Sequence, residues 1–508
     1  MILQIFLFTL FFFLLLIYSR SNTKKSFKTL PLPPGPWKLP LIGNIHQLIG
    51  SLPHHSLRNL ANKYGPLMHL QLGETTNVIV TSSEIAKQIF TTHEVIFSNR
   101  PHLLAAEIIT YNCWRQQMRN SKSGSNIGFS PHGNHWRQLR KICTLELLTA
   151  KRARSFRYIR EEEVSALVKD IRSHEGSVIN LSEKIFTTTN SIIAKAAFGK
   201  KSRDQEAFIS SLKEIMKVMG GFSIVDLFPS VKVLQVITGM RAKVERVHKL
   251  NDKILEDIIK DHKERKERSS ENTEENLLYV LLKIQQENDL ELPLTHKHIK
   301  AVILDMFIAG SESSSTSLEW AISELMKNPK VREKAQAEVR RIYGEKGYVD
   351  ESEIHQLKYL NSIVRETLRL HPPGVLLLPR ENTERCVIDG YEIPEKTKVI
   401  INAWAIGRDS KFWDEAEIFK PERFLDNPID FRGTNFDYIP FGAGRRMCPG
   451  INFALPNIEL PLASLLYHFD WKLPNGFTHE EFDMSETFGA GVRRKENLWL
   501  IPISYQHL

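Results

Sequence analysis

Hydrophobic residues recur at the three- and four-residue spacing of amphipathic helices over most of this chain. The spacing predicts helices within residues 137–282, 298–327 and 328–370. Asn328 followed by Pro329 suits the N-cap and the first turn of a helix. Alternating apolar and polar residues predict a hairpin over residues 67–80 and short strands within 387–393 and 399–402. The pattern therefore predicts a fold that is mainly α with a minor β part.

The chain opens with an apolar stretch, Met1–Tyr18, that is interrupted by Gln4 and Thr9. As a helix rising ~1.5 Å per residue, it would extend about 27 Å, close to the thickness of a thin bilayer core. The positive charges follow this stretch rather than precede it, which favours a retained signal anchor over a cleaved signal peptide. We therefore expect residues 1–19 to form a transmembrane anchor that leaves the rest of the chain in the cytosol.

Residues 20–37 are first basic and then rich in proline, and we expect them to form a hinge. The fixed φ angles and missing N–H groups of the prolines in Pro31–Pro36 exclude helix and strand and leave a stiff, extended strap. No further low-complexity boundary follows. Residues 38–508 are therefore expected to form a single large domain.

Composition narrows the class of protein. Of the 508 residues, 42% are hydrophobic and 25% are charged, which excludes a wholly disordered chain and a collagen-like repeat. The net charge of +9 permits an anionic partner but does not select one. The four cysteines are far apart and form no CxxC pair, so neither a disulfide framework nor a zinc finger is supported. A functional cysteine must therefore be identified by its neighbours.

One cysteine, Cys448, lies in the glycine-rich segment Phe441–Gly450, directly before a helical pattern over residues 452–466. N–H groups at a helix N-terminus stabilise a thiolate, which is the form that ligates metal. The glycines leave room for a flat group against the backbone, and Arg446 offers a cation to an anion on that group. A buried structural cysteine would explain a lone Cys-x-Gly. The two arginines and three glycines around Cys448 favour a ligand site instead.

This segment resembles the haem-binding loop of the cytochromes P450, with Cys448 in the place of the axial iron ligand. The resemblance implies the cytochrome P450 fold, a single haem-thiolate domain and haem b (iron protoporphyrin IX) as cofactor. It also implies which residues surround the haem: Arg100, Trp136, Arg140, Arg380, Phe441, Arg446 and Gly450, with Cys448 on the iron.

Two further segments match the family in the expected order. Glu366-x-x-Arg369 resembles its Glu-x-x-Arg motif, and Pro421–Phe424 resembles the segment that supplies a second arginine, here Arg423. A spacing of three puts Glu366 and Arg369 on one helix face, where such a pair is usually a surface ion pair. The resemblance favours a buried structural triad of Glu366, Arg369 and Arg423 that supports folding around haem.

The serine-rich segment Ala309–Ser314 lies inside an apolar helical pattern, although glycine and serine also suit a loop between two helices. The resemblance implies a long helix above the haem, locally opened where dioxygen binds. An acid followed by a hydroxyl suits proton delivery, so Glu312 and Ser313 are the predicted catalytic residues. The family more often has threonine at the position of Ser313.

The resemblance also implies the walls of a substrate pocket, most of them apolar: Val302, Asp305, Met306, Ala309, Val375, Leu376, Leu377, Phe488 and Ala490. An apolar cavity suits a hydrocarbon-like substrate, whereas Asp305 could equally pair with an amine. Residues Cys113–Ser125 stand where the family usually has only a few residues. A pocket lid and an exposed insertion are both consistent with their basic, small-residue composition.

The chain is most similar to plant A-type enzymes, in particular the D-like terpenoid oxidases of family 71. The predicted function is monooxygenation of a hydrophobic plant specialised metabolite, specifically a sesquiterpene or diterpene. Oxidation of an alkaloid or phenolic substrate is one alternative. A haem-thiolate isomerase that needs no reductase, or a haem protein without enzymatic activity, is another.

The predicted partners follow from the same resemblance. The chain carries no flavin or nicotinamide fingerprint, so electrons must come from a separate protein, implied to be NADPH–cytochrome P450 reductase. Basic residues such as Arg137, Lys141 and Arg445 would meet its acidic surface, unless they are only a solvated face. The other expected partners are O2, the hydrophobic substrate and membrane lipid, with no nucleic acid. The microsomal members imply a single-pass anchor in the endoplasmic reticulum.

Overall fold

The computed structural model describes residues 30–111, 125–200, 205–220, 222–268, 276–287 and 289–505. The predicted anchor and all but the last residue of the insertion Cys113–Ser125 lie outside these ranges. Over the ranges given, none of the helices combines the length and the apolar character that a membrane span requires.

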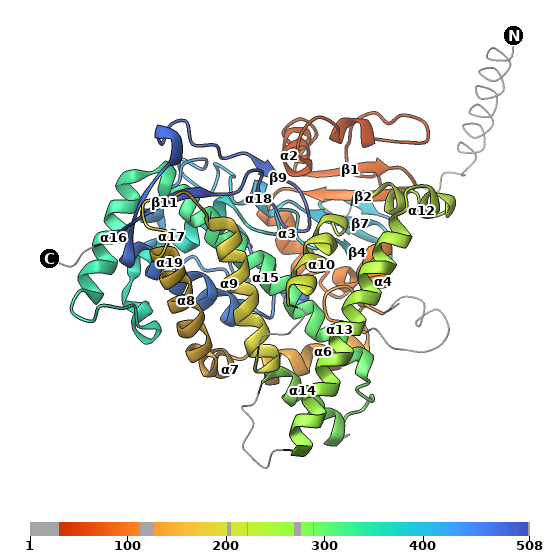
Figure 1. Ribbon diagram of the computed structural model, residues 1–508. Coiled ribbons are helices and arrows are strands. Elements are labelled where there is room, and N and C mark those ends of the chain that lie inside the picture. The colour runs from red at the N-terminus through yellow and green to blue at the C-terminus, as the bar shows by residue number, and fades with distance from the viewer. Residues whose placement is uncertain are drawn as a thin grey trace, which may run out of the picture.

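Helices dominate the described chain and surround the central helix α15 (Figure 1). The α-helices are α2 (Pro53–Tyr64), α3 (Ser83–Phe90), α4 (Leu104–Ile109), α6 (Asn134–Ile142), α7 (Ala150–Ser155), α8 (Arg157–Arg172), α9 (Leu181–Phe198), α10 (Gln205–Val218), α11 (Ile224–Leu227), α12 (Val233–Ile237), α13 (Met240–Arg268), α14 (Leu277–Glu287), α15 (His296–Lys327), α16 (Pro329–Tyr343), α17 (Lys358–Leu370), α18 (Ala403–Ile406) and α19 (Ile451–His468). Short 3₁₀ segments lie at Ile45–Leu48, Ile96–Ser98, Glu351–Gln356, Pro421–Phe424, Gly444–Arg446 and Pro474–Gly476, and a π-helical turn lies at Cys143–Leu147.

The strands form small sheets at the edge of the helical body. A four-stranded sheet has the order β1 (Leu67–Leu72), β2 (Thr75–Val80), β7 (Lys398–Ile401) and β4 (Arg380–Glu381), and its β2–β7 pair is parallel. The others are the three-stranded sheet β3 (Ile179–Asn180), β11 (Trp499–Ser504) and β8 (Phe469–Lys472), and the hairpins β5 (Cys386–Ile388) with β6 (Tyr391–Ile393) and β9 (Glu486–Thr487) with β10 (Arg493–Arg494).

Helix α15 connects the two largest hydrophobic cores. Its N-terminus is fixed by a capping box, in which the Thr295 hydroxyl accepts from the His298 N–H and the Thr295 N–H donates to His298 Nδ1. Phe307 in the first half packs with side chains of α9, α10 and α13, and Leu318 in the second half packs with α8, α17 and α19. Because both halves are buried in this way, α15 is a rigid support for any site along it.

The described part of the proline strap lies against the sheets. The carbonyl of Pro34 accepts the His69 N–H of β1 at 2.8 Å, and that of Pro31 accepts the Glu392 N–H of β6 at 2.9 Å. The strap is extended, as its prolines predict. It is fixed to the domain by backbone hydrogen bonds rather than being a free linker.

The predicted fold class is confirmed, and so is the predicted hairpin, which is β1–β2. Residues 387–393 form a second hairpin, because Asp389 and Gly390 have positive φ angles of 50° and 78° and reverse the chain. Helix α16 begins at Pro329 after Asn328, as predicted. The Asn328 side chain does not cap α16 but donates to the Glu324 carbonyl at the end of α15.

Candidate functional site

Cys448 lies in a tight loop at the start of α19. Its N–H donates to the Phe441 carbonyl at 2.9 Å, and its Sγ accepts the Gly450 N–H at 3.4 Å. Gly444 must be glycine here, because its φ is +66° and a Cβ would lie 2.9 Å from the Phe90 carbonyl oxygen. The loop is therefore closed upon itself and packed against the end of α3, with the sulfur held beside the N-terminus of α19.

The balance of effects on the Cys448 thiol differs from the sequence-based expectation. Burial raises the pKa of this thiol, while the Gly450 N–H and the Arg140 guanidinium oppose the rise. The helix N-terminus alone therefore does not make Cys448 a thiolate. A bound metal ion would, because a coordinating thiol is deprotonated outright.

Four arginines predicted to surround the haem converge near this loop: Arg100, Arg140, Arg380 and Arg446. Arg446 donates to the carbonyls of Ser98, at 2.8 Å, and Ser130, at 2.6 Å. Arg100 donates to Leu378 and Gly128, Arg380 to Phe97 and Ala443, and Arg140 to Met447. All of these acceptors are neutral backbone carbonyls.

This arginine cluster is buried positive charge. Burial lowers the pKa of Arg446 to about 9 and that of Arg380 to about 10, and neighbouring guanidinium groups add to the effect on Arg446. Guanidinium groups so close together are stabilised by anions such as paired carboxylates. A flat group carrying two propionates beside a cysteine fits this donor set, so the residues present fit haem.

Two predicted haem neighbours have other bonds in the structure. The indole Nε1 of Trp136 donates to the Ile127 carbonyl at 3.0 Å, and its ring lies 4.0 Å from the Arg446 guanidinium. The carbonyl of Phe441 accepts the Cys448 N–H, and its ring packs edge-on against Phe431. Trp136 thus supports Arg446, and Phe441 supports the cysteine loop.

Helix α15 brings Ala309, Glu312 and Ser313 together. The helix is unbroken across residues 309–314, which excludes a loop and shows no interruption at the predicted local opening. The Ser313 hydroxyl donates to the Ala309 carbonyl at 2.6 Å. Ala309 is exposed although Phe307 and Ser311 are buried, so this face of α15 borders open space.

Glu312 is a buried acid at this open face. Its side chain packs against Gly491, where a Cβ would lie 3.4 Å from Glu312 Cγ. Burial raises the pKa of Glu312, while the charges of Arg493 and Lys213 oppose the rise. The carboxyl therefore retains its proton to higher pH than an exposed glutamate does, which suits a group that supplies protons.

The remaining predicted pocket residues differ in how much surface they present. Met306, Leu377 and Phe488 are half-buried, and Ala490 is exposed. Val375 and Leu376 are buried beside Trp404 in the core under β1 and β2. Val302 is fully buried in the hydrophobic core that surrounds the first half of α15.

Asp305 is fully engaged in holding the segment that follows the insertion. Its Oδ1 accepts from Asn126 Nδ2 at 2.9 Å, and its Oδ2 accepts the N–H groups of Ile127 at 2.8 Å and Gly128 at 3.2 Å. Burial raises its pKa to about 6, although these hydrogen bonds oppose the rise. Sequence reasoning missed this role, because the partners are mostly backbone amides 177 and 178 positions away.

Replacing Asp305 by asparagine should remove a pH-dependent part of the stability. The carboxyl ionises near 3.8 in the unfolded chain and near 6 in the folded one, so the folded state binds more protons between these values. As pH rises from about 4 to about 6, wild type should lose about 3 kcal/mol of unfolding free energy relative to Asp305→Asn, and little more above that. Denaturant titrations at several pH values measure this, with the exposed Asp257→Asn as control. A pH-independent difference would contradict it.

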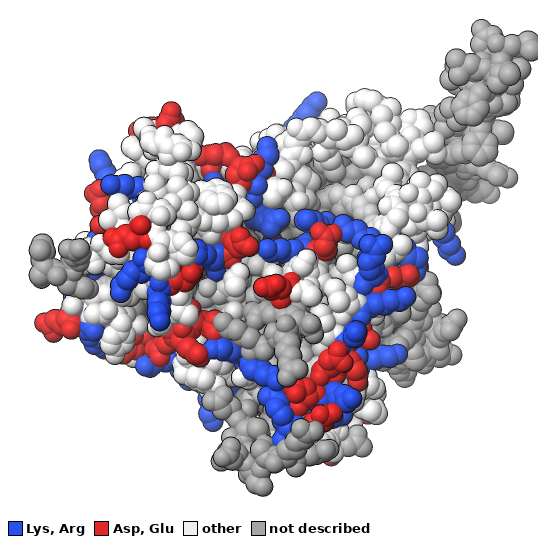
Figure 2. Space-filling view, in the orientation of Figure 1, with Lys and Arg blue, Asp and Glu red and all other residues white. Residues whose placement is uncertain are grey.

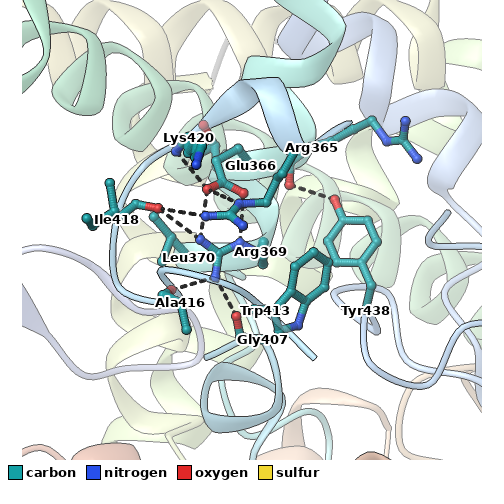
Figure 3. A network of polar contacts seen from close by, with 12 residues as sticks. Arg365, Glu366, Arg369, Leu370, Gly407, Trp413, Ala416, Ile418, Lys420 and Tyr438 are labelled. Atoms are coloured by element: carbon teal, nitrogen blue, oxygen red, sulfur yellow. Dashed lines mark hydrogen bonds and ion pairs between the residues drawn. The ribbon is translucent and has the colours of Figure 1, made fainter. Parts of the chain in front are cut away.

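Glu366, Arg369 and Arg423, whose side chains are at most 9% exposed, form one network, and Figure 3 labels Glu366 and Arg369 of it. Arg369 donates to both carboxylate oxygens of Glu366, at 2.7 and 2.8 Å, and Arg423 Nε donates to Oε1 at 2.9 Å. The Lys420 N–H donates to the same oxygen at 2.8 Å. The side chains of Glu366 and Arg369 are fully inaccessible, so this is not a surface ion pair.

The network ties α17 to the irregular chain that leads to the cysteine loop. Arg369 also donates to the carbonyls of Gly407 and Ala416, at 2.6 and 2.7 Å. Further along, the Tyr438 hydroxyl donates to the Arg365 carbonyl at 2.7 Å, as Figure 3 shows. The chain from Gly407 to Tyr438, which leads to Phe441, is therefore bonded to α17 at both of its ends.

Comparison with known proteins agrees with the fold. The cytochrome P450 family model matches residues 33–501, so the chain belongs to the cytochrome P450 family and is a cytochrome P450 monooxygenase. A zebrafish cytochrome P450 solved with progesterone has the same fold, with a TM-score of 0.74 over 89% of this chain and 100% of that one at 23% identity.

Plant relatives are far closer in sequence. Cytochrome P450 71D10 of Glycine max is 58% identical over 97% of this chain and 95% of its own length. Desmethyl-deoxy-podophyllotoxin synthase of Sinopodophyllum hexandrum is 55% identical over 94% and 92% of the two chains, and salviol synthase of Salvia pomifera is 52% identical over 97% and 96%. Within the cytochromes P450, the chain is therefore a member of plant family 71.

Proposed function

We propose that this enzyme oxidises a terpenoid, a sesquiterpene or diterpene, with electrons from NADPH–cytochrome P450 reductase at the endoplasmic reticulum membrane. The open face of α15 is the observation that supports this substrate class. Ala309 is exposed on this face, and Met306, Leu377 and Phe488, which the resemblance assigns to the same pocket, are apolar and half-buried. Such walls bind a ligand by fitting its shape and burying its apolar surface, which contributes about 25 cal/mol per Å² buried. Directional polar contacts contribute little there.

Asp305 does not favour an alkaloid substrate. An amine would need a carboxylate that can accept its N–H, but both Asp305 oxygens already accept hydrogen bonds from the segment Asn126–Gly128. The relatives named desmethyl-deoxy-podophyllotoxin synthase and salviol synthase carry the names of different products. The apolar walls and the engaged acid therefore support a terpenoid substrate.

The chain's own residues would have the following roles in this reaction. Cys448 would ligate the haem iron, and Arg100, Arg140, Arg380 and Arg446 would neutralise the propionates. Haem, when bound, supplies the activation of dioxygen, helped by electron density from the thiolate. Glu312 would supply protons near the open face, where burial raises the pKa of its carboxyl, and Ser313, whose hydrogen is donated to Ala309, would accept them through its lone pairs.

The surface beside the strap supports a membrane location. Trp37, Ile49, Val236 and Ile237 are each at least 66% exposed. Their two segments meet at the β1–β2 turn, where Gly73 donates to the Ile42 carbonyl and Glu74 to that of Leu227. Figure 2 shows that the surface over α2, β1 and α12 carries few charges, in contrast to the rest of this face. Such an apolar patch beside the strap, which follows the predicted anchor in the sequence, suits contact with lipid.

Two of the basic residues expected to meet a reductase are free to do so. Arg137 and Lys141 are exposed on α6 and line a surface groove of about 820 Å³ between α6 and α14. Helix α6 touches the cysteine loop through the bond from Arg140 to Met447. Arg445, in contrast, is paired with Glu94 at 2.9 Å and serves to anchor the loop.

The test is turnover of terpenes by the full-length enzyme with reductase and NADPH in membranes, comparing wild type with Ala309→Leu. The added bulk enters the open face of α15, so we expect a changed product ratio and about a tenfold lower rate. Ala337→Leu, on the exposed face of α16, is the matched control. Unchanged rate and products in Ala309→Leu would show that this face does not line the site. Oxidation without NADPH would show that the enzyme does not take its electrons from the reductase.

A further inference from the structure

The β9–β10 hairpin carries two of the predicted pocket residues, Phe488 and Ala490, on its loop. The tip of this loop touches the helices above the site: the Ala490 N–H donates to the Met216 carbonyl of α10 at 3.2 Å, and Gly491 packs against Glu312 of α15. A two-residue pairing of β9 with β10 cannot hold such a loop alone. Its position must be set at its base.

At the base, Glu486 of β9 is surrounded by histidines. Its Oε2 accepts from His54 Nε2 of α2 at 2.8 Å, and His55 Nε2 lies 3.3 Å from the same oxygen. His371, at the end of α17, has its Nδ1 3.9 Å from Oε1. The His54 side chain is fully buried, and those of Glu486 and His371 are about nine-tenths buried. Figure 1 shows β9 lying beside α2 and α18.

His371 also helps to fix the chain that enters β10, the other strand of the hairpin. His371 stacks on Trp320 of α15, with ring centroids 4.1 Å apart and planes 6° from parallel, and its Nε2 bonds to Glu324 at 2.7 Å. Trp320 Nε1 donates to the Val492 carbonyl at 3.1 Å. His54 in turn lies 6.2 Å from the ring of Phe488, nearly parallel to it. Both ends of the loop therefore depend on the contacts around Glu486.

We propose that Glu486, held by His54 and His371, is a positioning residue that sets the shape of the substrate pocket by fixing the loop between β9 and β10. This inference rests on the pocket proposed above. Glu486 acts through Phe488 and Ala490 and does not itself touch substrate. Loss of its charge would let the loop shift toward or away from the open face of α15, which would change which large ligands fit.

The cluster is better explained as a hydrogen-bond network than as a metal site. His54, His55 and Glu486 offer donor atoms within 4.8 Å of one another. However, the guanidinium groups of Arg58 and Arg408 lie over the neighbouring Trp404 ring, at 5.3 and 4.2 Å, and would repel a metal cation. Burial would raise the pKa of Glu486, but the adjacent His371 and His54 lower it far more, as expected for a carboxylate that accepts the His54 N–H and lies near His371.

The experiment compares how two azoles bind to the ferric haem of the full-length enzyme. Clotrimazole is bulky enough to reach the pocket walls, whereas imidazole is small, and both bind through nitrogen whatever the natural substrate is. For Glu486→Gln we expect the clotrimazole Kd to change about tenfold, as for a misfit in an apolar pocket, with the imidazole Kd and the reduced carbon monoxide spectrum unchanged. Glu496→Gln, on the exposed chain after β10, should behave as wild type.

His54→Gln is the second variant. It should shift the clotrimazole Kd in the same direction, and the double variant should shift it by less than the two single effects combined, because both act through one bond. An unchanged clotrimazole Kd in Glu486→Gln would overturn the proposal. Loss of haem from both single variants would also overturn it, because the cluster would then serve folding as a whole. A failed terpene assay leaves these measurements unaffected, so the two proposals fail separately.

Discussion

Cys448→Ala should lose thiolate ligation of the haem iron completely, and with it all monooxygenase activity. Cys448 is the cysteine that the structure places at the N-terminus of α19, beside the buried arginine cluster. A haem without its axial thiolate lacks the electron density that favours O–O cleavage. The measurement is the reduced carbon monoxide difference spectrum, in which the band characteristic of thiolate ligation should be absent, together with turnover in the presence of reductase.

Two other cysteines supply controls. Cys143 is fully buried between α6 and its π-helical turn, where burial raises its thiol pKa to about 12, and Cys386 lies in β5, where burial raises it to about 11. Cys143→Ala and Cys386→Ala should keep the thiolate-type band. A normal band in Cys448→Ala, or its loss in either control alone, would mean that the axial ligand has been misassigned.

The sequence predicted the cysteine loop and the Glu366 network because their chemistry lies in short, contiguous motifs. Glycines, arginines and a cysteine within ten residues restrict both the backbone and the charge. Glu366 and Arg369 share a helix face by their spacing alone. The structure adds that their network is inaccessible to water, which spacing does not reveal.

The arginine cluster was predicted through resemblance, but the way it is held was not. Its partners are carbonyls of residues such as Ser98, Gly128 and Ala443, and a carbonyl has no sequence signature. The same holds for Asp305, which was expected to face the substrate but accepts backbone N–H groups. Polar groups that bond to the main chain of distant segments can be assigned only after the chain is folded.

The sequence also missed the effect of burial on Cys448, although the Gly450 N–H favours the thiolate as predicted. The position of Cys448 before a helix predicted a stabilised thiolate, yet burial outweighs the helix N-terminus and raises the pKa of this thiol. How deeply a side chain is buried depends on every segment packed around it, so burial cannot be estimated from neighbours in sequence. The contact of Glu486 with His54, 432 positions apart, is unpredictable for the same reason.

Glu366→Ala should destabilise the fold by ~3–5 kcal/mol, because it leaves Arg369 and Arg423 as buried charges without their carboxylate. The loss would free the chain around Gly407 and Ala416 from α17, and with it the approach to the cysteine loop. We expect a lower denaturant midpoint and little haem-containing protein in the expressed fraction. Any enzyme that retains haem should keep the thiolate-type band, since the network does not touch Cys448.

Glu422→Ala is the matched control, one residue from Arg423 but with its carboxylate in an exposed pair with Lys334. Exposed pairs contribute about 0–1 kcal/mol, so this variant should unfold close to wild type. The comparison separates burial from charge, because both variants remove one glutamate that bonds to a cation. Equal midpoints for Glu366→Ala and Glu422→Ala would show that the inaccessible network contributes no more than a surface pair, and its structural role would have to be abandoned.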